Sequence, residues 1–484
     1  MQSNRRNNIR IIVLIAGALL FVLPRFISES EAVYALSPWI FSGCFLFYSR
    51  TCANWKERAF FTIVILIAHL IRYREVLGNS YLEYRLASVL VGIILTLASI
   101  APFYLDEYLV KNGNPVIGAI TYPVMRIVVE HFLIGKQFDL SLSQFGNKWL
   151  IQSTSVVGDA FVTFMVTFVP SVIVMMIIRN RERRVYIFGA ISLLLSAAVF
   201  IAGAVRYSKP LSLLDPIHMA YASGPQKVYY EEPSEDDASY SENETYLTRT
   251  AKEAAENGAK LIAYAEEAFI ITYEEEKVLT DKAVSAARDN DIFILLCLDS
   301  EDEEGAWVNK AVFIDNEGNI LSDYLKTNMI PVIEDDYKAG DGVIPCNQIT
   351  IDGQERNVSY SICYDATFPP YILTMDEKTD LFINPSWDWA EIDDINYRLQ
   401  AISAIESGVV LFKPTVDGVS IVTDPYGNLS YKESTLGGDY EEVRYVDVPG
   451  GRTDTIYSRI SKFVAPVWSF LALMILGYAV WRGG

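Results

Sequence analysis

Residues 359–370 read SYSICYDATFPP, and the interpretation of the whole chain depends on this stretch. An alternating run ends at Cys363, and an acidic residue and a proline pair follow within seven positions. A cysteine at the end of a strand is held rigidly and can face a cleft, a position that suits attack on a carbonyl carbon. Free cysteine is also among the residues most often fully buried. By itself the stretch therefore leaves open whether Cys363 is a nucleophile or a packing residue.

The composition places part of the chain in lipid and argues against nucleic acid as a partner. The chain has 484 residues, of which 51% are hydrophobic, and this fraction is too high for an ordinary soluble enzyme of two or three domains. Its formal charge is -20, whereas a protein that neutralises phosphates needs a basic face. We therefore expect a membrane protein that does not bind nucleic acid.

The cysteine and histidine content argues against disulfides, metal sites and cofactors. The five cysteines are odd in number, scattered and without a CxxC pair, so they predict neither a disulfide framework nor a structural metal. Three histidines are too few for a histidine-based catalytic set to be favoured. We expect no metal or cofactor, and structural roles for Cys44, Cys52, Cys297 and Cys346.

Eight segments are apolar enough to be candidate membrane spans. A hydrocarbon core about 30 Å thick needs roughly 20 mostly apolar helical residues to cross it. The candidates lie near 10–28, 34–50, 59–72, 86–106, 116–134, 154–178, 184–205 and 462–481. The third is short and the fifth carries Arg126 and Glu130, which are either functional or a sign of a misplaced boundary. The pattern predicts an N-terminal transmembrane domain of about seven helices over 1–205 and a C-terminal transmembrane helix over 460–484.

The distribution of positive charge predicts the orientation in the membrane. Three basic clusters fall on one side if the spans alternate, and short basic segments mark the cytoplasmic side. These clusters contain Arg5, Arg6, Arg10, Arg50, Lys56, Arg58, Arg179, Arg181, Arg183 and Arg184. The third connection goes against the rule, and an error of one span would reverse the result. We expect a multi-pass protein of the cell (cytoplasmic) membrane, with residues 206–461 on the extracytoplasmic side.

The long polar region reads as one layered α/β domain. Helix-like stretches such as TDKAVSAARDN alternate with apolar strands such as DIFILLCLDS and with hairpins around Asn and Gly. This alternation predicts helices packed on sheets, with reactive groups at the ends of strands. We expect a linker over 206–225 and a catalytic domain over 226–455.

Three strands of this region end on reactive residues, namely Glu266, Lys326 and Cys363. In this order they resemble the Glu-Lys-Cys triad of the nitrilase (carbon-nitrogen hydrolase) superfamily, whose fold is an αββα sandwich. Each residue alone is more often structural, but their order, spacing and strand-end placement together favour the triad. The resemblance predicts a multi-pass α-helical membrane domain joined to an α/β nitrilase-like sandwich.

Further segments extend the resemblance. Glu334 falls where a branch of the superfamily has a second glutamate, NPSWDWA contains Trp387 where the family has an Asn-x-x-Trp segment, and residues 397–428 resemble its Arg-x-x-Ala-x-Glu helix and following strands. Seven spans before such a domain and one after it are similar to the membrane branch that acylates lipoproteins.

The sequence also departs from that branch. Tyr264 and Ala265 precede Glu266 where the branch has Trp-Pro, Asp365 replaces a glutamate after Cys-Tyr, and Val416 starts an altered Asn-Asn-Gly. The neighbouring acid at 267 leaves the catalytic glutamate open by one position, and we choose Glu266 because it aligns with the motif's glutamate. These departures keep the amine acceptor in question.

The resemblance implies a role for each site residue. A thiol is only a few per cent ionised at neutral pH, so Glu266 would take its proton, and Lys326 with the backbone NH after Cys363 would hold the oxyanion. Glu334 would fix the lysine or line the cleft. Tyr364, Asp365 and Trp387 would support the site or bind substrate.

We therefore expect a monomeric membrane acyltransferase that moves an acyl chain from a phospholipid, through a thioester, to the N-terminal amine of a diacylglyceryl-cysteine in a lipidated protein. The alternatives are a membrane-tethered amidase or nitrilase-type hydrolase, an acyltransferase with a different amine acceptor, and a catalytically silent scaffold. The intact triad weighs against the scaffold. The many spans weigh against the hydrolase, because a phospholipid donor needs a membrane platform and a soluble amide does not.

Overall fold

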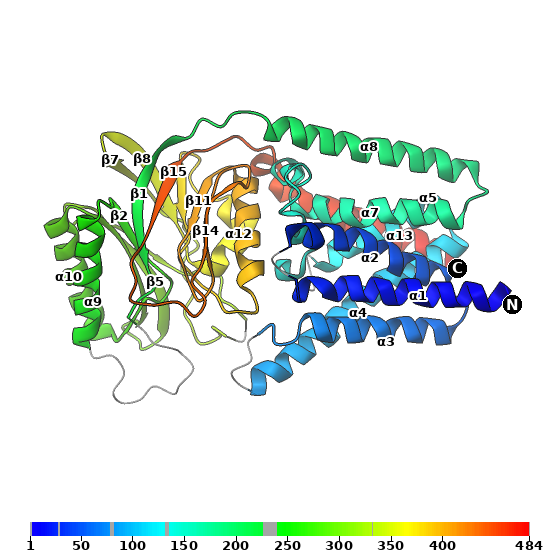
Figure 1. The fold of residues 1–484 in the computed structure, drawn as a ribbon, viewed down its shortest axis with the longest axis horizontal. Coiled ribbons are helices and arrows are strands. Elements are labelled where there is room, and N and C mark those ends of the chain that lie inside the picture. The colour runs from blue at the N-terminus through cyan, green and yellow to red at the C-terminus, as the bar shows by residue number, and fades with distance from the viewer. Residues whose placement is uncertain are drawn as a thin grey trace. The chain divides into compact units, whose positions relative to one another are not determined.

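The computed structural model describes residues 2–27, 30–77, 82–130, 135–225, 240–331 and 333–483. The chain divides into two units, Met1–Lys209 with Ile456–Gly484 and Pro210–Thr455 (Figure 1). The start of the predicted catalytic domain, 226–239, and the end of the predicted fifth span, 131–134, lie outside the described residues.

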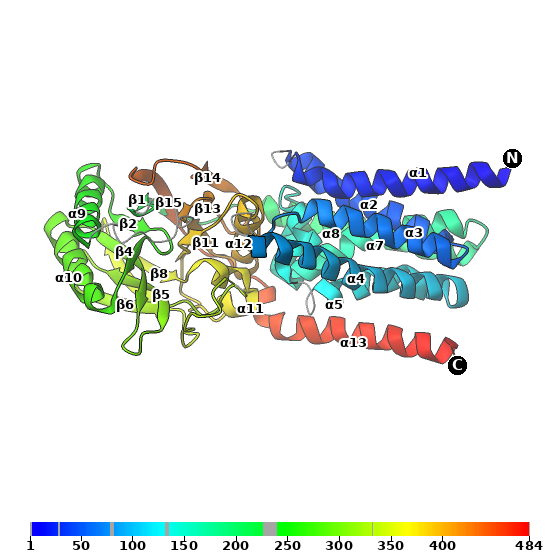
Figure 2. The same ribbon diagram turned by 90° about the horizontal axis from the view of Figure 1, so that it is seen from below.

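The first unit consists of helices that run side by side (Figures 1 and 2). Six of the helices in the described ranges are long and apolar enough to cross a membrane. They are α1 (Gln2–Val22), α2 (Glu31–Thr51), α4 (Leu82–Asn112), α7 (Asp159–Ile178), α8 (Arg183–Tyr207) and α13 (Tyr457–Gly483). The expected multi-pass helical domain is thus confirmed.

Two predicted spans form helices but are not among these six. α3 (Trp55–Arg72) begins with charged residues, and α5 (Pro115–Val129) has 15 residues. Short turns of 3-10 helix, η1 (Leu23–Arg25), η3 (Lys136–Phe138), η4 (Leu140–Gln144) and η5 (Ile151–Ser153), complete the unit. Length and hydropathy therefore support fewer spans than the eight expected from sequence.

The span predicted over 154–178 is broken in two, α6 (Thr154–Val157) and α7, at Gly158. Gly158 has a φ of +80°, and a Cβ there would lie 2.6 Å from the ring of Tyr457 at the start of α13. Only glycine combines this backbone with this approach. Further along α13, Ala472 and Ile475 are buried in one cluster with Val124 of α5. The C-terminal helix is therefore part of the first unit.

Two buried ion pairs lie among the described helices of the first unit. The Arg50 guanidinium donates two hydrogen bonds of 2.8 Å to the Asp106 carboxylate, and both side chains are fully buried. Arg126 and Glu130 form an ion pair of 2.5 Å that is also buried. Arg50, counted from sequence among the cytoplasmic loop charges, thus lies inside the helix bundle because α4 supplies a carboxylate opposite it. The orientation of the chain in the membrane remains a prediction, and it now rests on one fewer loop charge.

We expect the Arg50→Met substitution to destabilise the first unit by about 3 to 5 kcal/mol, because it leaves the Asp106 carboxylate buried without its cation. The double variant Arg50→Met/Asp106→Leu should recover most of this loss, since no unpaired charge remains. Thermal unfolding in detergent measures both. Equal unfolding temperatures for wild type and Arg50→Met would contradict the interpretation.

The second unit contains two large β-sheets. The first has the order β15-β1-β2-β4-β5-β6, with β3 paired to β4, and the second has the order β14-β13-β11-β9-β8-β7. The strands of the first are β15 (Arg444–Gly450), β1 (Leu214–Ala222), β2 (Leu261–Tyr264), β3 (Phe269–Ile271), β4 (Phe293–Glu301), β5 (Trp307–Ile314) and β6 (Ile320–Leu325). Those of the second are β14 (Leu429–Ser434), β13 (Val419–Thr423), β11 (Val410–Lys413), β9 (Leu381–Ile383), β8 (Gln354–Tyr360) and β7 (Cys346–Ile351). A short parallel pair, β10 (Ser386–Trp387) and β12 (Thr415–Val416), stands apart.

The two sheets pack face to face between layers of helices. α9 (Tyr240–Glu256) and α10 (Tyr273–Asn290) cover the first sheet, and α12 (Asp393–Ser407) with the short α11 (Pro369–Ile372) lies on the side of the second (Figures 1 and 2). Rings from facing strands meet in the core, such as Phe313 and Tyr360 with centroids 5.9 Å apart. Strands such as β4 are buried along nearly their whole length, which explains their continuous apolar sequence. The predicted αββα sandwich is confirmed.

The segment 206–225, predicted to be a linker, contains strand β1. This strand pairs with both β15 and β2, so it belongs to the first sheet. Its first residues are exposed and its last four are buried, which explains why the sequence before the strand resembles a connection.

Candidate active site

Glu266, Lys326 and Cys363 each follow a strand of the sandwich closely. Glu266 lies two residues after β2, Lys326 directly after β6, and Cys363 three residues after β8, where the short 3-10 helix η6 (Cys363–Thr367) begins. The residues are 3%, 1% and 2% exposed. The first two come from one sheet and the third from the other, so packing of the sheets brings the three together.

The Lys326 ammonium is held by two carboxylates. Its Nζ donates to Glu266 Oε1 at 2.7 Å and to Glu334 Oε1 at 2.6 Å. An ammonium has three N–H groups, so one remains for another acceptor. Glu334 in turn accepts a hydrogen bond of 2.7 Å at Oε2 from the backbone NH of Ile330, which fixes its carboxylate. The structure thus places the predicted supporting glutamate directly on the lysine.

Glu266 links the lysine to the loop after β9. Its Oε2 accepts a hydrogen bond of 2.7 Å from the backbone NH of Trp387, and its Oε1 accepts one of 2.9 Å from Asn309 Nδ2. The neighbouring Cys363 offsets part of the rise in the pKa of Glu266. The Cys363 Sγ lies 3.8 Å from the carbonyl oxygen of Trp387, to which the thiol donates. Trp387 therefore serves the site through its backbone, on which base and thiol converge.

The electrostatics of the site keep the thiol protonated and the lysine charged. Burial, reinforced by the negative Glu266, raises the pKa of the Cys363 thiol well above its ordinary value. Burial opposes the charge on Lys326, but Glu266 and Glu334 outweigh it and hold the lysine pKa well above its ordinary value. Burial also raises the pKa of Glu266, Lys326 lowers it, and Glu334 raises it again, with a net increase. A resting thiol of this kind needs a base before it attacks.

The backbone at Cys363 is held in an unusual conformation. Its φ is +42°, in the left-handed region that residues with a Cβ seldom adopt. Its NH donates to Pro385 O at 2.8 Å, and its carbonyl accepts a hydrogen bond of 3.0 Å from Asn384 Nδ2 and one of 3.4 Å from Gln400 Nε2. Since the NH of Cys363 is engaged, the NH of Tyr364 stays the predicted backbone donor to an oxyanion.

Glu267 shares the Asn309 side chain with Glu266 but makes neither of the other two hydrogen bonds described for Glu266. Its φ is +53°, a left-handed backbone conformation that directs its side chain differently from that of Glu266. Its Oε1 accepts a hydrogen bond of 3.0 Å from Asn309 Nδ2. Burial, with the charges of Asp299 and Glu266, raises the pKa of Glu267 well above its ordinary value. The contacts with Lys326 and with the backbone of Trp387 belong to Glu266. This geometry favours Glu266 as the base.

Asp365 joins the loop after Cys363 to the loop after Lys326. Its Oδ1 accepts hydrogen bonds of 2.7 and 2.8 Å from the backbone NH and the side chain of Asn328, and its Oδ2 accepts one of 2.6 Å from the Tyr324 hydroxyl. The predicted supporting role of Asp365 is thus consistent with a clamp between two catalytic loops. Tyr364 packs its ring edge-on against Phe368, with centroids 4.9 Å apart, and its role stays a prediction.

Asn309, Asn384 and Gln400 are contacts of the site that sequence reasoning missed. Each donates to Glu266 or to the backbone of Cys363 from a different element. Their buried polar side chains within apolar segments were the available signal, because buried amides are rarely left without partners.

Three carboxylates of the site lie close enough together to be compared with a metal centre. Among the described residues, Glu266, Glu267 and Glu334 place ligand atoms within 4.8 Å of one another. The Lys326 ammonium already donates to two of them. A divalent cation would have to displace or adjoin this positive charge, so the donor set fits a lysine better than a metal.

Comparison with known proteins found similarity over most of the chain. Residues 238–453 match the carbon-nitrogen hydrolase family. Apolipoprotein N-acyltransferase of Rickettsia prowazekii is 24% identical over 375 residues, 72% of this chain and 71% of that protein. The enzyme of the same name from Rickettsia typhi is 24% identical over 358 residues, 68% of each chain. Among solved structures, an amidase from Nesterenkonia sp. is 19% identical with a TM-score of 0.43, covering 54% of this chain and 99% of that chain.

The Glu334→Gln substitution should move the acid limb of the pH–rate profile for Cys363 alkylation to lower pH. The limb reports ionisation of Glu266, whose pKa the Glu334 carboxylate raises, so removing that charge lets Glu266 ionise at lower pH. The measurement is the rate of Cys363 alkylation by iodoacetamide against pH, followed by mass spectrometry. Glu276→Gln, which removes a carboxylate paired with Lys310 instead, is the matched control. An unmoved limb, or an equal shift in the control, would contradict the assignment.

Proposed function

We propose that this chain, whose residues 238–453 form a carbon-nitrogen hydrolase domain, is a membrane N-acyltransferase. In this proposal it takes an acyl chain from a phospholipid and passes it through a thioester on Cys363 to the N-terminal amine of a diacylglyceryl-cysteine in a lipidated protein. The ion pair of Glu266 with Lys326, buried together with the Cys363 thiol, carries the proposal.

Two further observations favour a transferase acting on lipids. The 375 residues matched by the Rickettsia prowazekii enzyme are more than the segment 238–453 contains, so the similarity extends into the helical unit. Six helices of the described part are apolar enough to span a membrane, a setting in which a phospholipid donor is at hand. A simple amidase would need only one such helix to tether it to a membrane.

In the first step, the thiol attacks the ester carbonyl of the phospholipid. Glu266 takes the Sγ proton as the sulfur–carbon bond forms, and the carbonyl oxygen becomes an oxyanion. The ester carbon–oxygen bond then breaks, and Glu266 returns the proton to the departing lysophospholipid oxygen. The products are the acyl-Cys363 thioester and a neutral lysophospholipid alcohol.

Lys326 would stabilise the oxyanion in both steps. Two of its N–H groups are engaged by Glu266 and Glu334, and the third is the proposed donor to the oxyanion, together with the backbone NH of Tyr364. A preformed charge in a site closed to water needs no reorganisation when the oxyanion appears.

In the second step, the neutral amine of the acceptor attacks the thioester. The nitrogen–carbon bond forms, Glu266 takes a proton from nitrogen, and the carbon–sulfur bond breaks. Glu266 then returns that proton to the Cys363 sulfur, which restores the starting state. The covalent intermediate lets two lipid-bearing substrates use one site in turn, so the kinetics should be ping-pong.

Incubation with phospholipid in the absence of acceptor should add one acyl mass to the wild-type chain. The adduct should be absent from Cys363→Ala and removed by hydroxylamine, because it is a thioester on that sulfur. Intact-protein mass spectrometry provides the measurement. Free fatty acid released at one rate with or without an amine acceptor would instead indicate the hydrolase, and transfer to an unrelated amine would indicate a different acceptor.

Lys326→Ala should slow formation of the thioester by about 100- to 1,000-fold, the usual loss for one oxyanion donor. The same loss should appear in kcat and in kcat/KM, since the interaction forms in the transition state. Single-turnover acylation measures the rate, with Lys310→Ala as a control lysine of the same sheet. A rise in KM with an unchanged rate constant would contradict this role.

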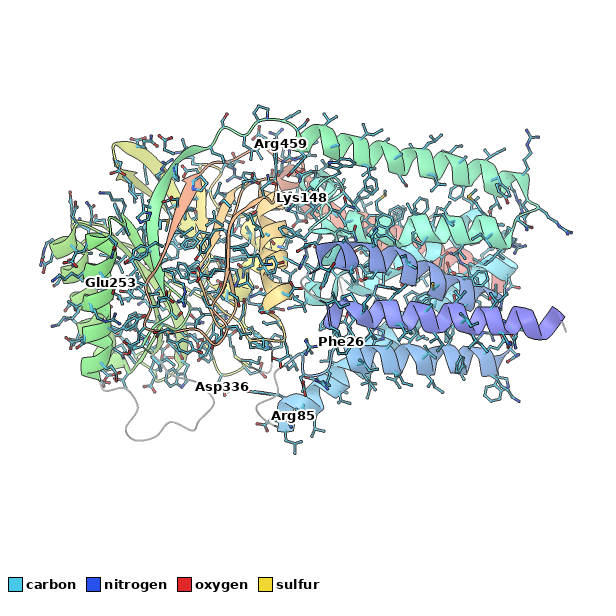
Figure 3. The ribbon with its side chains drawn as sticks, viewed as in Figure 1. Phe26, Arg85, Lys148, Glu253, Asp336 and Arg459 are labelled. Atoms are coloured by element: carbon cyan, nitrogen blue, oxygen red, sulfur yellow. The ribbon has the colours of Figure 1, made fainter. Side chains whose placement is uncertain are left out.

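The catalytic unit should lie on the extracytoplasmic side of the cell membrane. Lys252 on the outer helix α9 has a side chain that is 63% exposed, and its neighbour Glu253 is labelled in Figure 3. A Lys252→Cys variant should react in intact cells with a membrane-impermeant maleimide. Protection of this cysteine until the cells are lysed would place the unit in the cytoplasm.

A further inference from the structure

A second buried ion pair lies next to the candidate active site and has no part in the chemistry proposed above. Lys413 at the end of β11 donates from Nζ to Asp388 Oδ2 at 2.7 Å, and both side chains are fully buried. The ammonium also donates to Thr415 Oγ1 at 2.6 Å. The other oxygen of Asp388 accepts a hydrogen bond from the Asn396 side chain on α12.

Such a pair is weak evidence for stability. Removing two charges from water costs several kcal/mol for each ion, and apolar residues of similar volume often replace a buried pair without loss. The pair restricts the local geometry, because an ammonium and a carboxylate that each have further hydrogen-bond partners can adopt few relative positions.

Asp388 follows Trp387, whose backbone meets the base and the thiol. The NH of Trp387 donates to Glu266 Oε2 at 2.7 Å, and its carbonyl oxygen accepts from Cys363 Sγ at 3.8 Å. Asp388 itself donates its NH to Val416 O at 3.1 Å, and Trp387 is the register partner of Val416 in the β10–β12 pair. The ion pair therefore ties the strand that carries Trp387 to the strand that follows Lys413.

The space around the carboxylate is closely filled. A Cβ placed on Gly418 would lie 2.5 Å from the Asp388 side chain. Asp388 therefore has no room to move toward β13, and its carboxylate is held between Lys413, Asn396 and this glycine. A shift of the carboxylate would be transmitted to the adjoining peptide of Trp387.

We propose that Lys413 and Asp388 are positioning residues that hold the Trp387 backbone in place between the general base Glu266 and the nucleophile Cys363. This inference rests on the proposed role of those two residues. Loss of either charge should therefore slow the reaction of the thiol, because a misplacement of about 1 Å at a reacting group can reduce a rate by about 100-fold.

The test is alkylation of Cys363 by iodoacetamide, which requires no phospholipid substrate. Lys413→Met and Asp388→Asn should each slow the rate constant by 10- to 100-fold, on the scale of such displacements. Lys413 lowers the pKa of the Cys363 thiol and Asp388 raises it, so a slowing common to both variants reports position and not charge. Each should also move the acid limb to higher pH, because a weaker hydrogen bond from the Trp387 NH leaves the ionised Glu266 less stabilised. The double variant should react about as slowly as each single variant, since both substitutions break the same ion pair.

Lys310→Met is the matched control, since Lys310 belongs to an ion pair with Glu276 in the first sheet. Gly418→Ala is a second variant that displaces Asp388 while every charge is kept, and it should show the same slower rate and shifted limb. Lys413→Arg should restore part of the rate. Thermal unfolding and titration of reactive Cys363 give the folded fraction, to which each rate is normalised.

An unchanged normalised rate constant and acid limb in the folded fraction of Lys413→Met and Gly418→Ala would overturn the proposal and leave the pair a purely structural role. Failure of the wild type to form a thioester from phospholipid would contradict the proposed function alone, because alkylation would still report the position of Trp387.

Discussion

The Lys326 ammonium, held between Glu266 and Glu334 in a site closed to water, is the interaction on which the rest of the site depends. Two buried carboxylates beside a neutral thiol would repel each other and take up protons, so the base needs a cation next to it to remain available. The same cation then has one N–H left for the charge that develops on a substrate oxygen. In the proposed mechanism, one contact thus prepares both the base Glu266 and the oxyanion donor Lys326.

This arrangement requires the αββα sandwich. Glu266 and Lys326 follow strands of one sheet and Cys363 follows a strand of the other, so no single supersecondary element contains the site. The two sheets are fixed to each other by a continuous apolar core. The packing of the two sheets therefore sets the distances among Glu266, Lys326 and Cys363. The left-handed backbone at Cys363 then directs the thiol toward the other two residues.

Paired burial of charge recurs in the helical unit. The pairs Arg50–Asp106 and Arg126–Glu130 form within the bundle, as Lys413–Asp388 does in the sandwich. In each case one partner lies in a segment that is otherwise apolar. Such residues are costly in isolation, and their pairing explains how helices such as α4 continue past a charged position.

The sandwich, the helical unit and the positions of Glu266, Lys326 and Cys363 after strands could be predicted because they depend on local signals, namely hydropathy, alternation and residues that resemble a known motif. The long-range partners could not. Nothing near Asn309 indicates that it faces Glu266, and nothing near Lys413 indicates Asp388, because these contacts arise from packing of separate elements. Arg50 was placed in a loop for the same reason: its carboxylate lies 56 residues away in sequence. The alignment with the motif already favours Glu266 over Glu267, and the coordinates add the contacts of Glu266 with Lys326 and the Trp387 backbone.

The most direct test of the central claim is mass spectrometry of lipoprotein N-termini from cells with and without this gene. The account predicts an N-acylated diacylglyceryl-cysteine when the wild-type gene is present, and a free α-amino group when it is deleted or replaced by Cys363→Ala. Identical N-acylation in all three strains would contradict the assignment of this chain as a lipoprotein N-acyltransferase.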